Sequence, residues 1–204
     1  MNALTILKLL QQQNYEEIKR LCEFEICSAK SRNITAVKAR EKLARKVART
    51  VKGRSDIAGA ITVNGTQQIC DGCAVGIYND IQEGLVMAEY RENPLDFRNV
   101  VHQLHDKIEL DVQIDLQELR NKSKLAAVDG LKSKDQLVRV GDGYYRTEYI
   151  LDYLPTLTGS LTFSQQGNSD YPYKSLLVEG DNGCVLILPV RPSDKSMSQS
   201  VCAY

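Results

Sequence analysis

The chain has 204 residues, a length that suits one medium domain or two small ones. Its hydrophobic content of 43% and charged content of 25% are ordinary for a globular protein, and 26 basic residues balance 26 acidic ones. A net charge of zero means that any affinity for nucleic acid must come from a local patch. No apolar run is long enough to cross a membrane, and Lys8 interrupts the first apolar stretch, so we expect a cytoplasmic protein without a secretory segment.

Residues 1–32 have a helical pattern and are predicted to form an N-terminal extension. The apolar positions that share a helical face are Leu4, Leu7 and Leu10 on one face, and Ile18 and Leu21 on another. The pattern leaves two alternatives open. Asn14 could divide the region into two short helices, or residues 24–27 could form a strand that leads into the next helix.

Residues 33–52 predict a helix with two chemically different faces, with Asn33 as its N-cap. At 100° per residue, five basic residues fall within about 40° of one line along the helix. This basic stripe consists of Lys38, Lys42, Arg45, Arg49 and Lys52. The opposite, core-facing side carries Leu43 and Val47, and Arg40 is the exception that falls on the apolar side. The stripe could be an ordinary solvated helix surface, but such surfaces normally mix charges of both signs. A surface with one sign of charge also suits contact with a phosphate backbone.

Residues 58–63, 67–70 and 74–78 are predicted strands, with turn signals at Asn64-Gly65 and Asp71-Gly72. The second turn lies within a C-x-x-C spacing. Two cysteine pairs could together bind zinc and make the chain a zinc-stabilised module: Cys70 with Cys73, and Cys22 with Cys27. The spacing of the second pair is poor for zinc, so we expect reduced thiols and a β-turn with Asp-Gly at its centre.

Residues 81–136 have the weakest pattern and are predicted to form a helical insertion. Asn93-Pro94 starts one predicted helix, and Asp115 is the predicted N-cap of a second. The inward positions of the two helices are Val100, Val101, Leu104, Leu116, Leu119 and Leu125. His102 and His105 are three residues apart, but no acidic or cysteine partner has matching spacing, so we expect no metal site.

The last third of the chain has the clearest pattern. Residues 137–141 alternate as a strand, and Thr147 is the predicted N-cap of a helix. That helix has its apolar stripe at Ile150, Leu151 and Leu154, and it ends at Pro155 and Gly159. Three strands are predicted after it, at 160–164, 175–179 and 184–190. The last two are joined by the hairpin sequence Gly180-Asp181-Asn182-Gly183, and residues 193–204 are predicted to form a flexible tail.

Two motifs in this stretch point to a known family. The helix reads Tyr149-Ile150-Leu151-Asp152-Tyr153-Leu154, and the final strand ends in Leu188-Pro189-Val190-Arg191. They resemble the Y-[IL]-L-D-x-L helix and the C-terminal apolar-Pro-apolar-Arg segment of the bacterial β sliding clamp, the processivity ring of the replicative DNA polymerase. The resemblance is strongest over 137–191 and weaker over 34–80, where Cys73 and Ala74 stand in place of the family's His and Arg.

The resemblance implies an α+β fold with one DNA-clamp-like domain over 33–192, in which two helices pack on antiparallel sheets. Extra helices would lie in the N-terminal extension and in the insertion. A second interpretation divides the chain at Pro94-Leu95-Asp96-Phe97-Arg98-Asn99-Val100, which is similar to the linker between clamp domains. We prefer the first, because two abbreviated domains would each have too few strands to close a sheet.

The resemblance also implies a function. Basic helices line the inside of the clamp ring, so the basic stripe would contact double-stranded DNA without reading its sequence. The family captures partner peptides near its C-terminal segment, which implies a peptide pocket formed by Leu188, Pro189, Val190 and Arg191. Leu188 and Val190 could each instead be core residues of an ordinary strand. A ring needs six clamp domains, so a single-domain chain could form one as a homo-oligomer of six copies. It could also act alone or form a smaller assembly through its helical N-terminus.

The sequence has no phosphate-binding glycine loop, nucleophile elbow or H-E-x-x-H motif, so we expect a protein that is not an enzyme and needs no cofactor. The main hypothesis is a clamp-like accessory protein of DNA replication or repair that also binds peptide motifs of replication or repair proteins. The alternative is a clamp-fold protein outside any ring, which acts as a regulatory or protein-interaction module without DNA binding.

Overall fold

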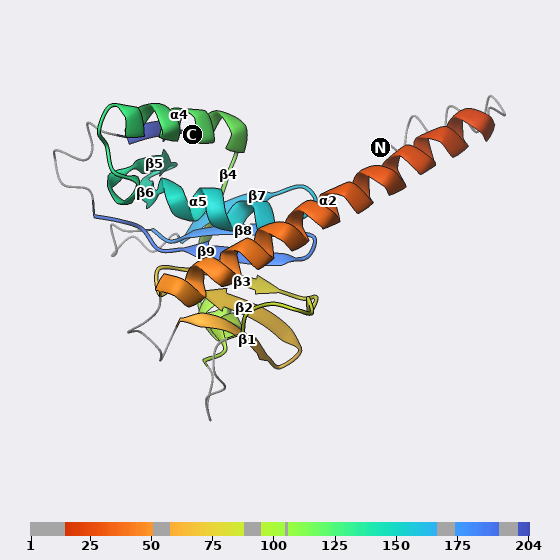
Figure 1. The fold of residues 1–204 in the computed structure, drawn as a ribbon, viewed down its shortest axis with the longest axis horizontal. Coiled ribbons are helices and arrows are strands. Elements are labelled where there is room, and N and C mark those ends of the chain that lie inside the picture. The colour runs from red at the N-terminus through yellow and green to blue at the C-terminus, as the bar shows by residue number, and fades with distance from the viewer. Residues whose placement is uncertain (1–14, 51–57, 88–94, 105, 167–173, 192–199) are drawn as a thin grey trace.

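The computed structural model describes residues 15–50, 58–87, 95–104, 106–166, 174–191 and 200–204. Within these residues the protein has the predicted α+β class, with one large antiparallel sheet and one small sheet (Figure 1). Its helices are α2 (Tyr15–Thr50), α3 (Phe97–His102), α4 (Leu116–Val128) and α5 (Thr147–Tyr153), with 3-10 turns η1 (Ser133–Asp135) and η2 (Leu154–Thr156). No helix in the described ranges is both long and apolar enough to cross a lipid bilayer.

The large sheet has the strand order β1-β2-β3-β9-β8-β7-β4, and neighbouring strands are antiparallel. Its strands are β1 (Gly59–Val63), β2 (Thr66–Cys70), β3 (Ala74–Tyr78), β4 (Lys107–Leu110), β7 (Thr162–Gln166), β8 (Leu176–Gly180) and β9 (Gly183–Ile187). The predicted turn at Asn64-Gly65 and the predicted hairpin at Gly180-Asp181-Asn182-Gly183 are confirmed. Asn64 and Gly65 have φ angles of 48° and 76°, the left-handed values that a two-residue turn needs, and Asp181-Asn182 joins β8 to β9.

The sheet is built from two copies of one pattern, a helix followed by a three-stranded meander. The first unit is α2 with β1, β2 and β3, and the second is α5 with β7, β8 and β9. The units meet where β3 pairs with β9. From this junction the third, second and first strand of each unit follow in order toward the edge of the sheet. Strand β4 breaks the symmetry, because it adds to the outer edge of β7.

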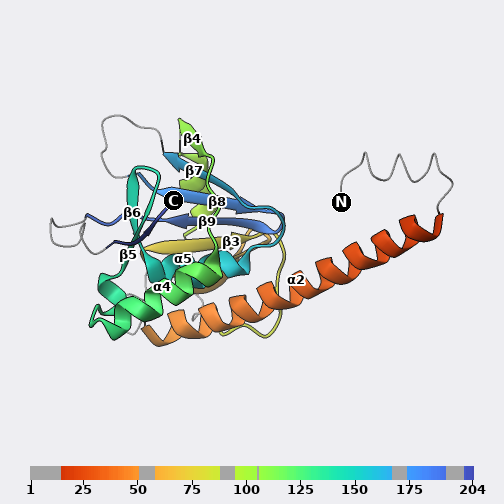
Figure 2. The same ribbon diagram turned by 90° about the horizontal axis from the view of Figure 1, so that it is seen from above.

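Side chains that alternate along the central strands form a core on each face of the large sheet. On one face Ala74 and Tyr78 of β3 join Val185 of β9 in the main core. That core is covered by α2 and α5, and Figure 2 shows both helices on the same side of the strands. On the other face Val75 and Leu186 pack with Val101 of α3. The two repeated helices therefore share one face of the sheet, which we call the helical face.

The small sheet has the order β10-β5-β6, with β5 (Leu137–Val140), β6 (Gly143–Arg146) and β10 (Ser200–Ala203). Strand β6 was not predicted, and Gly141, which was expected to belong to the strand before it, lies in the turn between β5 and β6. The prediction of a flexible tail is wrong for β10, which pairs in parallel with β5. The partly buried Val201 packs against the main core, so the end of the chain gains a partner that its own composition does not reveal.

Two predicted helix starts are wrong. Asn33 is not an N-cap, because α2 runs unbroken from Tyr15 to Thr50 and excludes the alternative strand at 24–27. No glycine or proline interrupts that stretch, so a single cap-forming residue does not end the helix. The first part of α2 extends beyond the sheet (Figure 2). Helix α5 is capped at Arg146 instead of Thr147, because β6 leads directly into it. Asn14 lies outside the described residues.

The insertion at 81–136 is only partly helical, since it contributes β4 to the large sheet. Strand β4 was missed because it has only four residues, mostly exposed, and its alternation of polar and apolar residues is too short to stand out. Helix α3 starts after Asp96, whose carboxylate accepts a hydrogen bond from the Arg98 backbone N–H. The predicted cap at Asp115 is confirmed. The inward position Leu119 is fully buried, but Val100 and Leu125 are exposed, contrary to prediction.

Candidate nucleic-acid interface

The basic stripe lies on the outer side of α2, as its helical spacing predicts. Ala36, Leu43 and Val47 are buried on the side of α2 that packs on the sheet. The stripe residues that the structure describes are exposed on the opposite side: Lys38, Lys42, Arg45 and Arg49. Lys52 lies outside the described residues. The four described cations therefore point away from the sheet, on the helical face.

These cations are available to an anionic ligand. Arg45 is 61% exposed and has only a distant contact, 3.9 Å, with Glu41 one turn away. Lys38, Lys42 and Arg49 have no ion pair with a carboxylate in the described part of the chain. All four border one solvent-open hollow along the helix, together with Glu41 and Lys46. The stripe can therefore bind phosphate oxygens without first breaking a strong ion pair.

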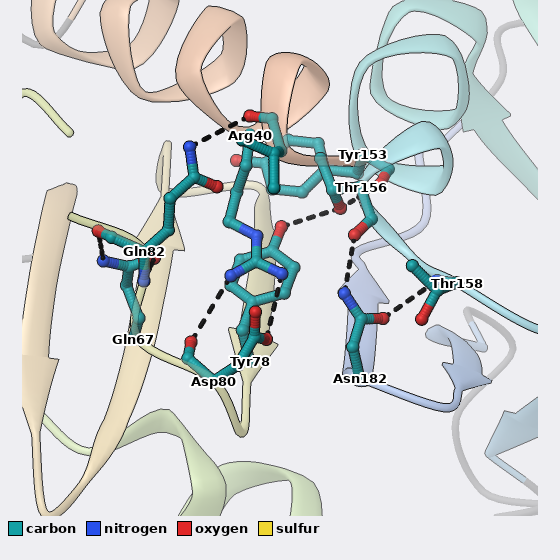
Figure 3. Close-up of polar contacts among 10 residues, drawn as sticks. Arg40, Gln67, Tyr78, Asp80, Gln82, Tyr153, Thr156, Thr158 and Asn182 are labelled. Carbon is teal, nitrogen blue, oxygen red and sulfur yellow. Dashed lines mark hydrogen bonds and ion pairs between the residues drawn. The ribbon is translucent and has the colours of Figure 1, made fainter. Parts of the chain in front are cut away.

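Arg40, the one basic residue on the apolar side of α2, anchors the helix to the sheet. Its side chain is 1% exposed and donates from Nη2 to Asp80 Oδ1 at 3.0 Å and from Nη1 to the Asp80 carbonyl at 3.3 Å (Figure 3). Its guanidinium also lies 4.1 Å from the centre of the Tyr78 ring. Because Asp80 is 56% exposed, this pair keeps one end in water and avoids the full cost of burying two charges.

Tyr78 links the anchor of α2 to the end of α5. Its hydroxyl donates to Thr156 Oγ1 at 2.8 Å, and the Thr156 carbonyl accepts from Asn182 Nδ2 at 3.0 Å (Figure 3). Burial raises the pKa of Tyr78 far above its ordinary value, so the hydroxyl stays protonated and keeps donating. The ring covers Gly76, where a Cβ atom would come within 2.2 Å of the hydroxyl oxygen. Both repeated helices are thus fixed to the centre of one sheet.

A second ionic contact joins α2 to α5 directly. Lys46 Nζ donates to Asp152 Oδ2 and lies 3.6 Å from Glu148 Oε2. Burial by itself lowers the pKa of Lys46, but the hydrogen bond and charge of Asp152, with the charge of Glu148, raise it above its ordinary value. Arg146 lies 3.7 Å from the other oxygen of Glu148. These four side chains balance each other, so α5 does not continue the basic stripe.

The four residues of the expected peptide pocket lie together between the two sheets. Strand β9 ends at Ile187, so the segment is not part of a regular strand. Leu188 N–H donates to the Cys73 carbonyl, and Val190 N–H donates to the Tyr144 carbonyl. Leu188 is 45% exposed, while Pro189 and Val190 are half-buried and Arg191 is exposed. The backbone is therefore held at two points, with an apolar side chain left at the surface.

The C-x-x-C sequence forms the predicted turn. Asp71 Oδ1 accepts from the backbone N–H groups of Cys73 and Ala74, both at 2.8 Å. Burial raises the pKa of the Cys70 thiol to about 12, which disfavours the thiolate that a zinc site needs. The described residues contain no cluster of three metal-binding side chains. The side chains of Cys22, Cys27 and His105 lie outside the description.

Sequence reasoning located the basic stripe but missed its supports. Asp80, Tyr78 and Thr156 have no local pattern that indicates their contacts with α2 and η2. Asp152 belongs to the helix motif, yet its pairing with Lys46 spans 106 positions and needed the fold. Comparisons with protein-family models, curated proteins and solved structures return no match for this chain.

Proposed function

We propose that this protein is a clamp-like accessory protein of DNA replication or repair that contacts double-stranded DNA without sequence preference through the basic stripe. The observation that carries the proposal is the doubled helix–meander unit, whose two helices share one face of a continuous sheet. Sliding clamps have helices toward the DNA and sheets on the outside. The outer side of α2 would then face the DNA backbone.

The chemistry of the stripe suits a phosphate backbone. From Lys38 to Arg49 the helix rises about 16 Å, a length over which duplex DNA presents several phosphates. Lysine and arginine neutralise these charges and release counterions, which favours binding without reading bases. No exposed aromatic side chain is present among residues 34–49, so the stripe offers no stacking platform for single strands.

The segment Leu188–Arg191 would serve as the docking point for partner peptides. Its exposed Leu188 and the half-buried Pro189 and Val190 give an apolar surface, and Arg191 adds a positive charge at its end. Such a surface suits a short peptide with apolar side chains and an acidic group. This role does not require catalysis or a cofactor.

A second candidate function is favoured by one observation. Glu148 and Asp152 place two carboxylates on α5, on the face that would meet DNA. A clamp-fold protein that binds only proteins would tolerate this charge, whereas a DNA-lining helix would normally be basic. The alternative is therefore a regulatory or interaction module that does not bind DNA.

Charge-neutralising variants separate the two functions. Lys42→Gln with Arg45→Gln should weaken binding to a 30-base-pair duplex at least tenfold at low salt, because two phosphate contacts are lost. The matched control is Lys132→Gln with Lys134→Gln, which removes two exposed lysines at η1 and should leave binding unchanged. Equal loss in both pairs would show general charge attraction, and the absence of duplex binding by the unaltered protein would favour the second function.

A further inference from the structure

The two helices on the helical face differ in how their charges are used. The described cations of the basic stripe have weak or no ion pairs within the described chain, whereas the charged residues of α5 are all engaged. Glu148 and Asp152 both meet Lys46, which lies next to the stripe on α2. The charged residues that form close ion pairs therefore lie where α2 contacts α5, and the cations of the basic stripe lie beside that contact.

Lys46 lies beside the basic stripe, but its charge is already paired with carboxylates of α5. Lys46 borders the same hollow as the stripe residues, but its ammonium group donates to Asp152 and lies 3.6 Å from Glu148. A phosphate that approached Lys46 would have to displace one carboxylate and stay close to both. Like charges at such distances repel strongly where water is partly excluded, and the two carboxylates are only 20% and 23% exposed.

We propose that Glu148 and Asp152 confine phosphate binding to α2: they hold Lys46 out of the interface and repel the DNA backbone from α5. The inference rests on the proposed function and names the residues that set the width of its DNA footprint. Only one helix of the repeated pair then contacts DNA. Binding through one helix gives a lower affinity for DNA, which suits a protein that moves along the duplex.

The test uses the full chain, a 30-base-pair duplex and fluorescence anisotropy over 50 to 200 mM salt. Glu148→Gln with Asp152→Asn keeps the shape of both side chains and removes their charge. We expect tighter binding, with the slope of log affinity against log salt steeper by about 0.9 for the freed contact at Lys46, and by up to as much again for Arg146, which Glu148 also pairs. The matched control is Glu118→Gln on α4 with Asp129→Asn at the end of that helix, which makes the same charge change and frees Lys122 from its pair with Glu118. It should leave the slope unchanged.

A double-mutant cycle with Lys46→Met makes the test specific. In the unaltered protein this change should shift DNA affinity less than twofold, because Lys46 is already paired. In the Glu148→Gln, Asp152→Asn protein the same change should lower the slope by the increment of about 0.9 that belongs to Lys46. Thermal unfolding of each variant shows that it is folded.

The outcomes separate this inference from the proposed function. If the unaltered protein binds duplex and the carboxylate variant binds no more tightly, the inference is wrong and the function stands. If only the carboxylate variant binds, the carboxylates close the helical face to DNA and the proposed function of the unaltered protein is wrong. If neither binds, both are overturned.

Discussion

Helices α2 and α5 occupy equivalent places in the two halves of the large sheet, yet they differ in length, charge and anchoring. Helix α2 has 36 residues and exposes the basic stripe, while α5 has seven and carries two carboxylates. Helix α2 is anchored by the buried guanidinium of Arg40, and α5 by apolar residues such as Ile150. The two helices therefore pack on the sheet in equivalent positions although their exposed charges differ. Their packing does not indicate which helix binds a ligand, whereas their surface charge does.

The apolar anchor of α5 offers the largest expected effect. Ile150→Ala removes a fully buried side chain from the main core and should lower the free energy of unfolding by about 4 kcal/mol. Urea denaturation followed by circular dichroism measures this. Leu125→Ala, at a 65% exposed position of α4, is the control and should cost less than about 0.5 kcal/mol. Equal values would mean that α5 does not pack as described.

The polar anchor of α2 should matter slightly less. Arg40→Ala removes two hydrogen bonds to Asp80 and the packing against Tyr78, and we expect a loss of about 3 kcal/mol in unfolding free energy. The control Arg45→Ala changes an exposed arginine on the same helix and should have little effect. A loss from Arg40→Ala no greater than from the control would contradict the anchoring role.

The junction between the two units can be broken at one glycine. Gly76→Ala places a methyl group against Tyr78, whose hydroxyl is held by Thr156 and cannot move freely. We expect a cost of about 2 kcal/mol from this overpacking. Differential scanning calorimetry would show a lower melting temperature. An unchanged melting temperature would mean that the Tyr78 ring is not fixed over β3.

The ionic link between the helices should give the smallest effect, and it depends on pH. Because the folded protein raises the pKa of Lys46, this link stabilises the protein below the ordinary lysine value of about 10.4 and is lost as pH rises through the higher folded value. Solvent screens the 42% exposed Lys46, so the gain is about 0.5 kcal/mol. Lys46→Met should therefore cost about this much at pH 8, and the cost should vanish once the pH exceeds the raised pKa of Lys46 in the folded protein. A difference that stayed constant with pH would exclude the ionic link as its source.

The sequence predicted the parts of the fold that depend on local signals. Asn64-Gly65 and Asp181-Asn182 specify hairpins through their own backbone preferences, and Asp115 caps α4 with its own carboxylate. It could not reveal β4 and β10, because each is stabilised by a partner strand far along the chain. The predicted N-cap at Asn33 was wrong because a cap-forming residue can also lie inside a helix.

The candidate site divides in the same way. Helical periodicity alone placed Lys38, Lys42, Arg45 and Arg49 on one exposed face, because that face depends only on the 100° step of the helix. The roles of Arg40 and Lys46 depend on Asp80 and Asp152, which lie 40 and 106 positions away. No periodic pattern carries that information.

The most direct measurement is the salt dependence of duplex binding by the unaltered protein. With four described stripe cations available, the slope of log affinity against log salt should be about −3.6, a loss of roughly 100-fold in affinity between 50 and 200 mM salt. That result, with equal affinity for duplexes of unrelated sequence, would support the basic stripe as a DNA-binding surface. A slope near zero, or no binding at 50 mM salt, would contradict it.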